Sequence, residues 1–329
     1  MMRPDYVIRG ESVVTSLCRK DTTLVTGSEE GNIKLYDTEI MRPTATWKAH
    51  KTQVMCMKNQ QHDGILSQGR EGALTLWKEG QCVRTSSVAS TGFCRFALSD
   101  DQRHCFVGLD EKSKISCIVA DKLNVVNTFQ PSDYNQKGMC WSVAVRGNYV
   151  YLGYESGQIV LFDSRHLSKQ VLEVKVHDEI VTALDVIDNK IISSSPDSTI
   201  KITSLITEGM VSEGTPSKEE STVSGDENAL ESIVNSLNPA RTDQKYSAEV
   251  THTVPLECKG SSHISIRGDG KLYAVSGWDG GLRLYSCKKN KLLGLVEAHN
   301  PETITDMMTY DNKIVCSGRD CKISFWTFY

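Results

Sequence analysis

The sequence lacks the features that mark several large classes of protein. No apolar run reaches 18 residues, and the first ten residues contain no apolar stretch of the kind found in signal peptides, so we expect neither a membrane span nor secretion. Charge is nearly balanced, with 37 basic and 41 acidic residues and no basic stripe, which disfavours nucleic acid as a partner. We therefore expect an intracellular protein that binds neither membranes nor nucleic acids.

Motifs for metal binding and catalysis are also missing. The sequence has eleven cysteines, but no pair has Cys-x-x-Cys spacing and no cysteine–histidine cluster has zinc-finger spacing. We interpret the cysteines as reduced thiols that pack as small hydrophobic groups. A Gly-rich phosphate loop and a Gly-x-Ser-x-Gly elbow are both absent. The prediction is a protein without cofactor, metal or enzymatic activity.

A strand-like phrase that returns about every 41 residues is the main positive feature. Each clear copy combines a turn, alternating apolar residues and a terminal aromatic, and the seven copies end at residues 36, 77, 118, 162, 203, 285 and 326. A period of ~40–45 residues with this pattern is typical of WD40 propeller blades. We predict an all-β fold, a seven-bladed WD40 β-propeller that spans residues 1–329 as one domain. The copies are Gly31–Tyr36, Gly72–Trp77, Ser113–Ile118, Gly157–Phe162, Ser198–Thr203, Gly280–Tyr285 and Cys321–Trp326.

The two ends of the chain predict how the ring closes. The third strand of the seventh blade, Lys322–Trp326, is followed by only three residues, so that blade lacks an outer strand. Asp5–Arg9 precedes the first strand of blade 1, Val13–Leu17, and has no other partner. We predict that this N-terminal strand completes the last blade and so removes exposed sheet edges.

Three histidines that end the connections between blades are predicted to be structural. In WD repeats such a histidine bonds to an acid in the next turn between second and third strands, near the tryptophan that ends the third strand. A His–Asp pair without a positioned nucleophile is not a catalytic triad. The second repeat has glutamate as the acid, and the fifth has Thr203 in place of tryptophan. The predicted structural residues are His50, Trp77, His177, Asp197, His299, Asp320 and Trp326.

One interval of 82 residues contains an insertion, residues 207–250, which we place between blades 5 and 6. Nine acids and three bases within 206–250 give it a net charge of −6, whereas the rest of the chain carries +2. This composition is typical of disordered segments. A capping-box-like start at Ser224 and apolar residues at helical spacing up to Leu237 indicate a candidate helix. The insertion could be a passive linker, a docking motif for a partner's groove or, because Ser217 and Ser224 precede acids, a phosphorylation site.

The loops at one rim of the ring form the candidate binding surface. The residue before each acid in the turns between second and third strands is expected near the top face, beside the starts of the innermost strands. Trp278 occupies a turn tip where a large aromatic has no evident core role, although it could pack flat on the neighbouring blade. Arginine and tryptophan are enriched in interface hot spots. The candidate partner-binding residues are Gln53, Met55, Arg70, Trp141, Glu155, Trp278, Thr305 and Arg319.

Several phrases resemble one WD40 family, that of the guanine nucleotide-binding protein beta-subunit-like protein 1, whose fungal counterpart is called ASTRA-associated protein 1. The resemblance implies a non-enzymatic adaptor, monomeric within a larger complex, in cytoplasm and nucleus. It further implies that the adaptor assists the TTT co-chaperone complex in the maturation and stability of phosphatidylinositol-3-kinase-related kinases. The phrases are Leu66–Gly72, Ser90–Arg95, Gly138–Cys140, Gly153–Asp163, Gly277–Gly280 and Ile323–Tyr329.

Two other functions stay open. Leu161–Arg165 is similar to the Trp-Asp-x-Arg box of substrate receptors of cullin-RING ubiquitin ligases, with Phe162 in place of the tryptophan. A G-protein β subunit is disfavoured, because those proteins carry a long N-terminal helix and the first strand of this chain begins by Asp5.

Overall fold

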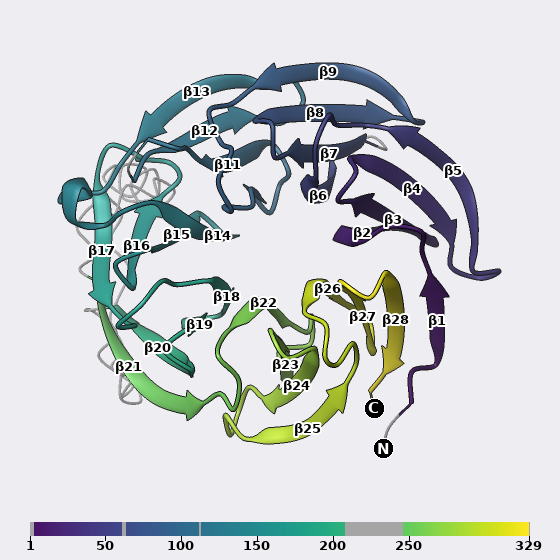
Figure 1. The fold of residues 1–329 in the computed structure, drawn as a ribbon. Coiled ribbons are helices and arrows are strands. Elements are labelled where there is room, and N and C mark those ends of the chain that lie inside the picture. The colour runs from purple at the N-terminus through teal and green to yellow at the C-terminus, as the bar shows by residue number, and fades with distance from the viewer. Residues whose placement is uncertain (1–2, 61–63, 112, 208–245, 329) are drawn as a thin grey trace, which may run out of the picture.

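The computed structural model describes residues 3–60, 64–111, 113–207 and 246–328. These residues form 28 strands and one short 3-10 turn, Tyr134–Gln136. The strands lie in seven four-stranded antiparallel sheets arranged in a ring (Figure 1), which confirms the predicted all-β, seven-bladed propeller. Among the described residues no helix has the length and apolar content needed to cross a membrane.

Six of the seven blades are built from four consecutive strands that run in order from the ring axis outward (Figure 1). Blade 1 contains β2 (Val14–Lys20), β3 (Thr23–Ser28), β4 (Asn32–Asp37) and β5 (Arg42–Lys48), and blade 2 contains β6 (Val54–Gln60), β7 (Gly64–Gly69), β8 (Ala73–Lys78) and β9 (Gln81–Ser87). Blade 3 contains β10 (Ala97–Leu98), β11 (His104–Gly108), β12 (Ile115–Val119) and β13 (Asn124–Phe129), and blade 4 contains β14 (Cys140–Arg146), β15 (Tyr149–Tyr154), β16 (Gln158–Asp163) and β17 (Gln170–Lys175). Blade 5 contains β18 (Ala183–Ile187), β19 (Lys190–Ser195), β20 (Thr199–Thr207) and β21 (Tyr246–Pro255), and blade 6 contains β22 (Ser261–Ile266), β23 (Leu272–Gly277), β24 (Gly281–Ser286) and β25 (Leu292–Glu297).

The seventh blade joins the two ends of the chain. Its inner strands are β26 (Ile304–Tyr310), β27 (Lys313–Gly318) and β28 (Lys322–Thr327), and its outer strand is β1 (Tyr6–Arg9). β1 pairs antiparallel with β28, with Tyr6 opposite Phe325 and Arg9 opposite Lys322. The predicted closure of the ring by the N-terminal strand is therefore present, and β1 runs beside β28 in Figure 1.

The hydrophobic core lies between neighbouring blades. Alternation along each strand sends apolar side chains to both faces of a sheet, and each face packs on the next blade. Val25 and Ile33 of blade 1 share a buried cluster with Val54 and Trp77 of blade 2. The ring is therefore stable only when every blade has two neighbours, as in other repeat architectures.

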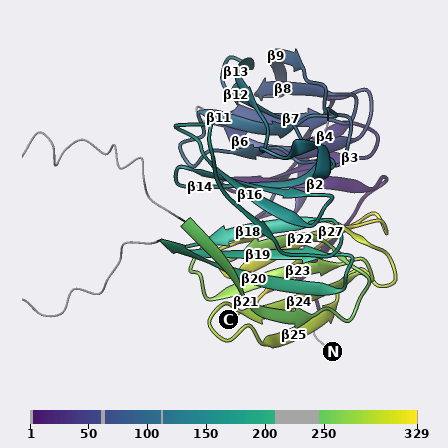
Figure 2. The ribbon, with the colours of Figure 1, turned by 90° about the vertical axis from the view of Figure 1, so that its left-hand side faces the viewer.

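The acidic insertion begins and ends within one blade. We predicted residues 207–250 between blades 5 and 6, but Thr207 ends β20 and residues 246–250 belong to β21, which pairs with β20. The insertion therefore joins the third and fourth strands of blade 5, because β21 is the outer strand that the sequence pattern does not reveal. β20 and β21 project beyond the other blades in Figure 2. The candidate helix up to Leu237 lies outside the described residues.

Candidate functional site

The three predicted structural histidines each bridge an acid and a hydroxyl. In blade 2, His50 Nδ1 lies 2.9 Å from Glu71 Oε1, and its Nε2 lies 2.6 Å from Ser67 Oγ. The indole of Trp77 donates to the same hydroxyl over 2.8 Å. Glutamate thus replaces aspartate without loss of the contact, and the chain of bonds ties the connection between blades 1 and 2 to the middle of blade 2.

Blades 5 and 7 use the same arrangement with one change each. His177 bonds to Asp197 and Ser193, but Thr203 stands where the tryptophan would be, and its buried hydroxyl has no partner among the described residues. His299 bonds to Asp320 over 2.8 Å and to Ser324 over 3.0 Å.

The hydroxyl group in these arrangements was not among the predicted residues. Ser67 and Ser193 lie on second strands, whereas Ser324 lies on a third strand, directly opposite Cys316. In blade 7 the serine has therefore moved across the ladder. A serine ten residues before the tryptophan would have been the signal in blade 2, and no such serine exists in blade 7.

Electrostatics supports the structural role of these histidines. Burial lowers the pKa of His50 and His177 below the usual value, so both rings are neutral near pH 7. Burial acts to raise the pKa of Glu71, but hydrogen bonds from Thr52 and His50 outweigh it and lower the pKa to about 2. A neutral imidazole between a carboxylate and a hydroxyl is a satisfied hydrogen-bond bridge.

Seven of the eight candidate partner-binding residues line one hollow on the top face, the face that carries the turns between second and third strands. The hollow has a volume of about 470 Å³ and lies over the centre of the ring. The eighth candidate, Glu155, lies outside the lining and acts on it, since its carboxylate accepts a hydrogen bond of 3.2 Å from the indole of Trp141. We name this site the top-face hollow; the seven residues are Gln53, Met55, Arg70, Trp141, Trp278, Thr305 and Arg319.

One wall of the top-face hollow is a stack of two aromatic rings capped by an arginine. Phe93 and Trp141 are stacked with centroids 5.1 Å apart and an interplanar angle of 15°. The guanidinium of Arg70 lies 4.5 Å from the centroid of Phe93, a cation–π contact. Phe93 is 51% exposed. The sequence did not predict a role for Phe93 beyond its place in the family-like phrase Ser90–Arg95, because a single phenylalanine in a loop carries no signal of its own.

Trp278 lines the hollow from blade 6. Its indole donates to Ser262 Oγ over 3.1 Å, and a side chain at Gly260 would meet the ring at 3.1 Å. The ring therefore packs on the start of its own blade, beside Gly260 and Ser262. It remains 40% exposed, so a large apolar surface stays open to a partner.

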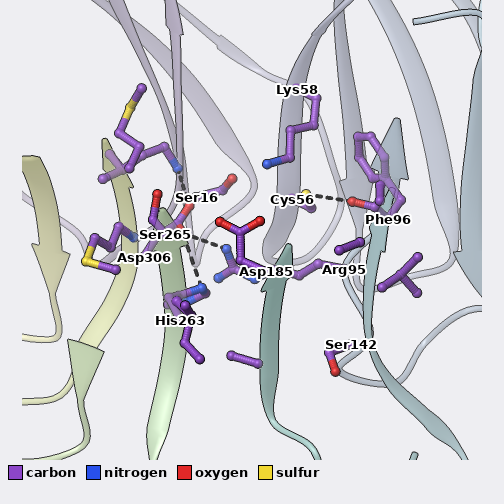
Figure 3. Close-up of a pocket in the computed structure, with 18 of the residues that line it drawn as sticks. Ser16, Cys56, Lys58, Arg95, Phe96, Ser142, Asp185, His263, Ser265 and Asp306 are labelled. Atoms are coloured by element: carbon purple, nitrogen blue, oxygen red, sulfur yellow. Dashed lines mark hydrogen bonds and ion pairs between the residues drawn. The ribbon is translucent and has the colours of Figure 1, made fainter. Parts of the chain in front are cut away.

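Below the hollow, charged side chains meet in the centre of the ring (Figure 3). Arg95, from the loop before β10 in blade 3, reaches across the ring to blade 7. Its Nη1 lies 2.8 Å from Asp306 Oδ1, and its Nη2 donates to the carbonyls of Thr15 and Thr305 over 2.9 Å. One side chain thus connects blades 3, 7 and 1 and forms the floor of the hollow.

The groups around Arg95 have shifted pKa values. Burial acts to raise the pKa of Asp306, but Arg95 and His263 outweigh it and the net shift is downward. Burial, with Arg95, lowers the pKa of His263 to about 4, and its Nε2 donates to Thr305 O. Burial raises the pKa of Asp185, although two backbone N–H groups donate to it. Sequence reasoning missed this cluster, whose only signal is a polar residue at an inward position of an innermost strand.

The arrangement as a whole offers a binding surface. Among residues 3–60, 64–111, 113–207 and 246–328, no three His, Cys, Asp or Glu side chains are placed to hold a metal ion. The aromatic and arginine groups surround a floor that includes Arg95. Their chemistry suits contact with another protein, since tryptophan and arginine dominate interface hot spots.

The fold and the histidine bridges define a WD40-repeat propeller. A family model described as "WD domain, G-beta repeat" matches residues 2–37. A solved structure, the β-propeller domain of Myceliophteria thermophila Cps50 (Swd1), superposes with a TM-score of 0.75 over 99% of both chains at 14% sequence identity, which speaks for the fold alone.

Curated relatives cover the chain nearly end to end. Guanine nucleotide-binding protein subunit beta-like protein 1 of Mus musculus is 25% identical over 99% of this chain and 96% of its own length. ASTRA-associated protein 1 of Schizosaccharomyces pombe is 23% identical over 99% of both chains, and that of Pyricularia oryzae is 23% identical over 90% and 83%. These similarities confirm the resemblance. The chain is a WD40-repeat β-propeller that is similar to these proteins along nearly its whole length.

Proposed function

We propose that this protein is an adaptor that assists the TTT co-chaperone complex in the maturation and stability of phosphatidylinositol-3-kinase-related kinases, in cytoplasm and nucleus. The observation that carries the proposal is full-length similarity to proteins named ASTRA-associated protein 1. The top-face hollow is the proposed contact surface. It combines a rigid scaffold with exposed aromatic and arginine groups.

The family-like phrases support this choice of surface. Leu66–Gly72, Ser90–Arg95 and Gly277–Gly280 each contribute side chains to the lining of the hollow. Gly138–Cys140 immediately precedes Trp141, which also lines it. Phrases from separate blades therefore converge on one site, which is the arrangement expected if they share a partner.

The test is affinity purification of the full-length protein from its own cells, followed by mass spectrometry. The tag belongs at the C-terminus on a long linker, because β1 closes the ring at the other end. Trp278→Ala is compared with Leu293→Ala, a matched control in the same blade whose side chain is 58% exposed on β25, away from the hollow. We expect TTT components or the giant kinases with the wild type and the control, and their depletion with Trp278→Ala.

Three outcomes would count against the proposal or its contact surface. Recovery of neither co-chaperone nor kinase with the wild type would refute the adaptor function. Equal recovery with Trp278→Ala and the control would place the contact away from the hollow. Recovery of a cullin adaptor would favour the ubiquitin-ligase alternative, which the relatives do not favour. In the structure Arg165 of that candidate box pairs with Asp163 over 2.6 Å.

A further inference from the structure

We propose that the top-face hollow binds an acidic peptide segment of a partner protein, with an aromatic or aliphatic side chain between the acids. This inference rests on the proposed function, since it uses the same surface, and it adds the chemistry of the partner. Its basis is the balance of charge in the lining together with an apolar centre.

The charged groups of the lining leave positive charge unpaired. Arg70 and Arg319 have no carboxylate within ion-pair distance among the described residues, whereas Arg95 is already paired with Asp306. Glu29 is the one acidic side chain in the described lining, and no described side chain pairs with it. Two free guanidinium groups therefore face one free carboxylate, in a chain whose net charge is −4. Guanidinium groups bind carboxylates or phosphates through paired N–H donors.

The hollow also has an apolar part. The aromatic side chains of Phe93, Trp141 and Trp278 line the hollow, and the buried side chains of Met55 and Ile304 also belong to its lining. A volume of about 470 Å³ lies in the range of sites that enclose a small ligand or anchor side chain. An aromatic or branched side chain would bury the exposed part of Phe93 on binding.

A protein segment fits the hollow better than a nucleic acid strand does. Single-stranded nucleic acid needs a continuous basic groove beside its stacking platforms. The lining has two unpaired cations on separate blades, with Glu29 in blade 1 between them in ring order. A phosphate backbone that reached both arginines would be repelled by the carboxylate of Glu29. A peptide with spaced acids would place one acid at each arginine.

The experiment uses the purified full-length protein and fluorescein-labelled 12-residue peptides, with binding followed by fluorescence anisotropy. The first probe has acidic residues on both sides of a central phenylalanine. The second replaces the acids by lysine, the third replaces the phenylalanine by alanine, and the fourth carries phosphoserine in place of two acids. A single-stranded dT12 oligonucleotide serves as the fifth probe.

Three substitutions test whether the affinity changes in the direction that the charge of each side chain predicts. Arg70→Gln and Arg319→Gln should each weaken the acidic phenylalanine peptide about two- to fivefold, the range of an exposed ion pair. Glu29→Gln should strengthen it by a similar factor, because a repulsive charge is removed. The matched control is Arg84→Gln, an exposed arginine on β9 of the same blade as Arg70, and it should leave the affinity unchanged. Affinity should fall as salt is added.

The remaining outcomes separate this inference from the proposed function. Tighter binding of the lysine peptide or of dT12, or weaker acidic binding by Glu29→Gln, would overturn the inference. Equal binding of the alanine peptide would remove the apolar anchor. Tighter binding of the phosphoserine peptide would retain it and identify phosphate as the anion. TTT recovery without acidic-peptide binding refutes only the inference, and acidic-peptide binding without TTT recovery refutes only the proposed function.

Discussion

Ile8→Ala tests the closure of the ring at β1, the short N-terminal strand that completes blade 7. Ile8 is the buried side chain of β1, 8% exposed, and it packs in a cluster with Val315, Ile323 and Phe325 of blade 7 and with residues of blade 1. Truncation of a buried isoleucine to alanine costs about 2–5 kcal/mol. We expect about 3 kcal/mol, because the site lies near the rim of the ring.

The expected change in melting temperature follows from the size of the chain. The entropy of unfolding of globular proteins is about 2.1 cal/mol/K per residue, which gives roughly 0.7 kcal/mol/K for this length. The melting temperature should therefore fall by about 4 °C for Ile8→Ala, measured by circular dichroism. Arg9→Ala, an exposed neighbour on the same strand, is the matched control and should change it by less than about 1 °C.

Removal of residues 1–9 should act in the same direction and more strongly. It deletes the whole ladder with β28, including the backbone bond of 2.8 Å from Asp5 to Phe325, and exposes the edge of β28 to other chains. If the shortened chain melts at the wild-type temperature, or if Ile8→Ala and Arg9→Ala behave alike, β1 does not close the ring in solution.

Three further predictions concern the buried polar groups. His299→Ala should lower the unfolding free energy by about 2–3 kcal/mol, because it leaves a buried acid and hydroxyl unpaired; equal denaturation midpoints for it and for His166→Ala, an exposed control, would contradict this. The pKa of His263 is about 4 against ~6.5 in an unfolded chain, so the unfolded chain takes up a proton before the folded one does. The free energy of unfolding should therefore be highest above pH 6.5 and should fall as the pH drops toward 4, by about 2 kcal/mol at pH 5. Urea titrations at pH 5 and above pH 6.5 should show a smaller loss of unfolding free energy in His263→Gln than in the wild type. The same pH dependence in both proteins would refute the lowered pKa of His263. Iodoacetamide should label exposed Cys82 first and leave Cys140 unlabelled until unfolding, since burial raises the pKa of Cys140 well above its usual value; equal labelling rates by peptide mass spectrometry would argue against its burial.

Much of the fold could be predicted because its signal is local and repeated. Each third strand carries its own turn and alternation, so the register of the blades survives even in the weak copies at Ser113–Ile118 and Ser198–Thr203, which lie at β12 and β20. Closure could be predicted from an unpaired strand at each end of the chain. The outer strand β21 could not, because its residues continue the polar composition of the insertion and its partner precedes it by about forty residues.

The site was predictable only where position in the repeat defines it. Turn residues such as Arg70 and Trp278 share a face by symmetry, and the structure does bring them to one hollow. Phe93 and Arg95 lie in the irregular entry to blade 3, whose innermost strand has only two residues. No periodicity applies to that loop, so the stack on Trp141 and the bond to Asp306 depend on contacts between blades that the linear sequence does not express.

The pairing of β1 with β28 also sets the order of events during synthesis. Tyr6 leaves the ribosome long before its partner Phe325 exists, and at ~5–20 residues per second the delay is roughly 15–60 s. Throughout that time the nascent chain is an arc with an unpaired strand at one end and an unmatched sheet face at the other. Every new copy therefore has to be kept from aggregating before its last strand emerges. A protein proposed to help large kinases mature would itself need protection during its own synthesis.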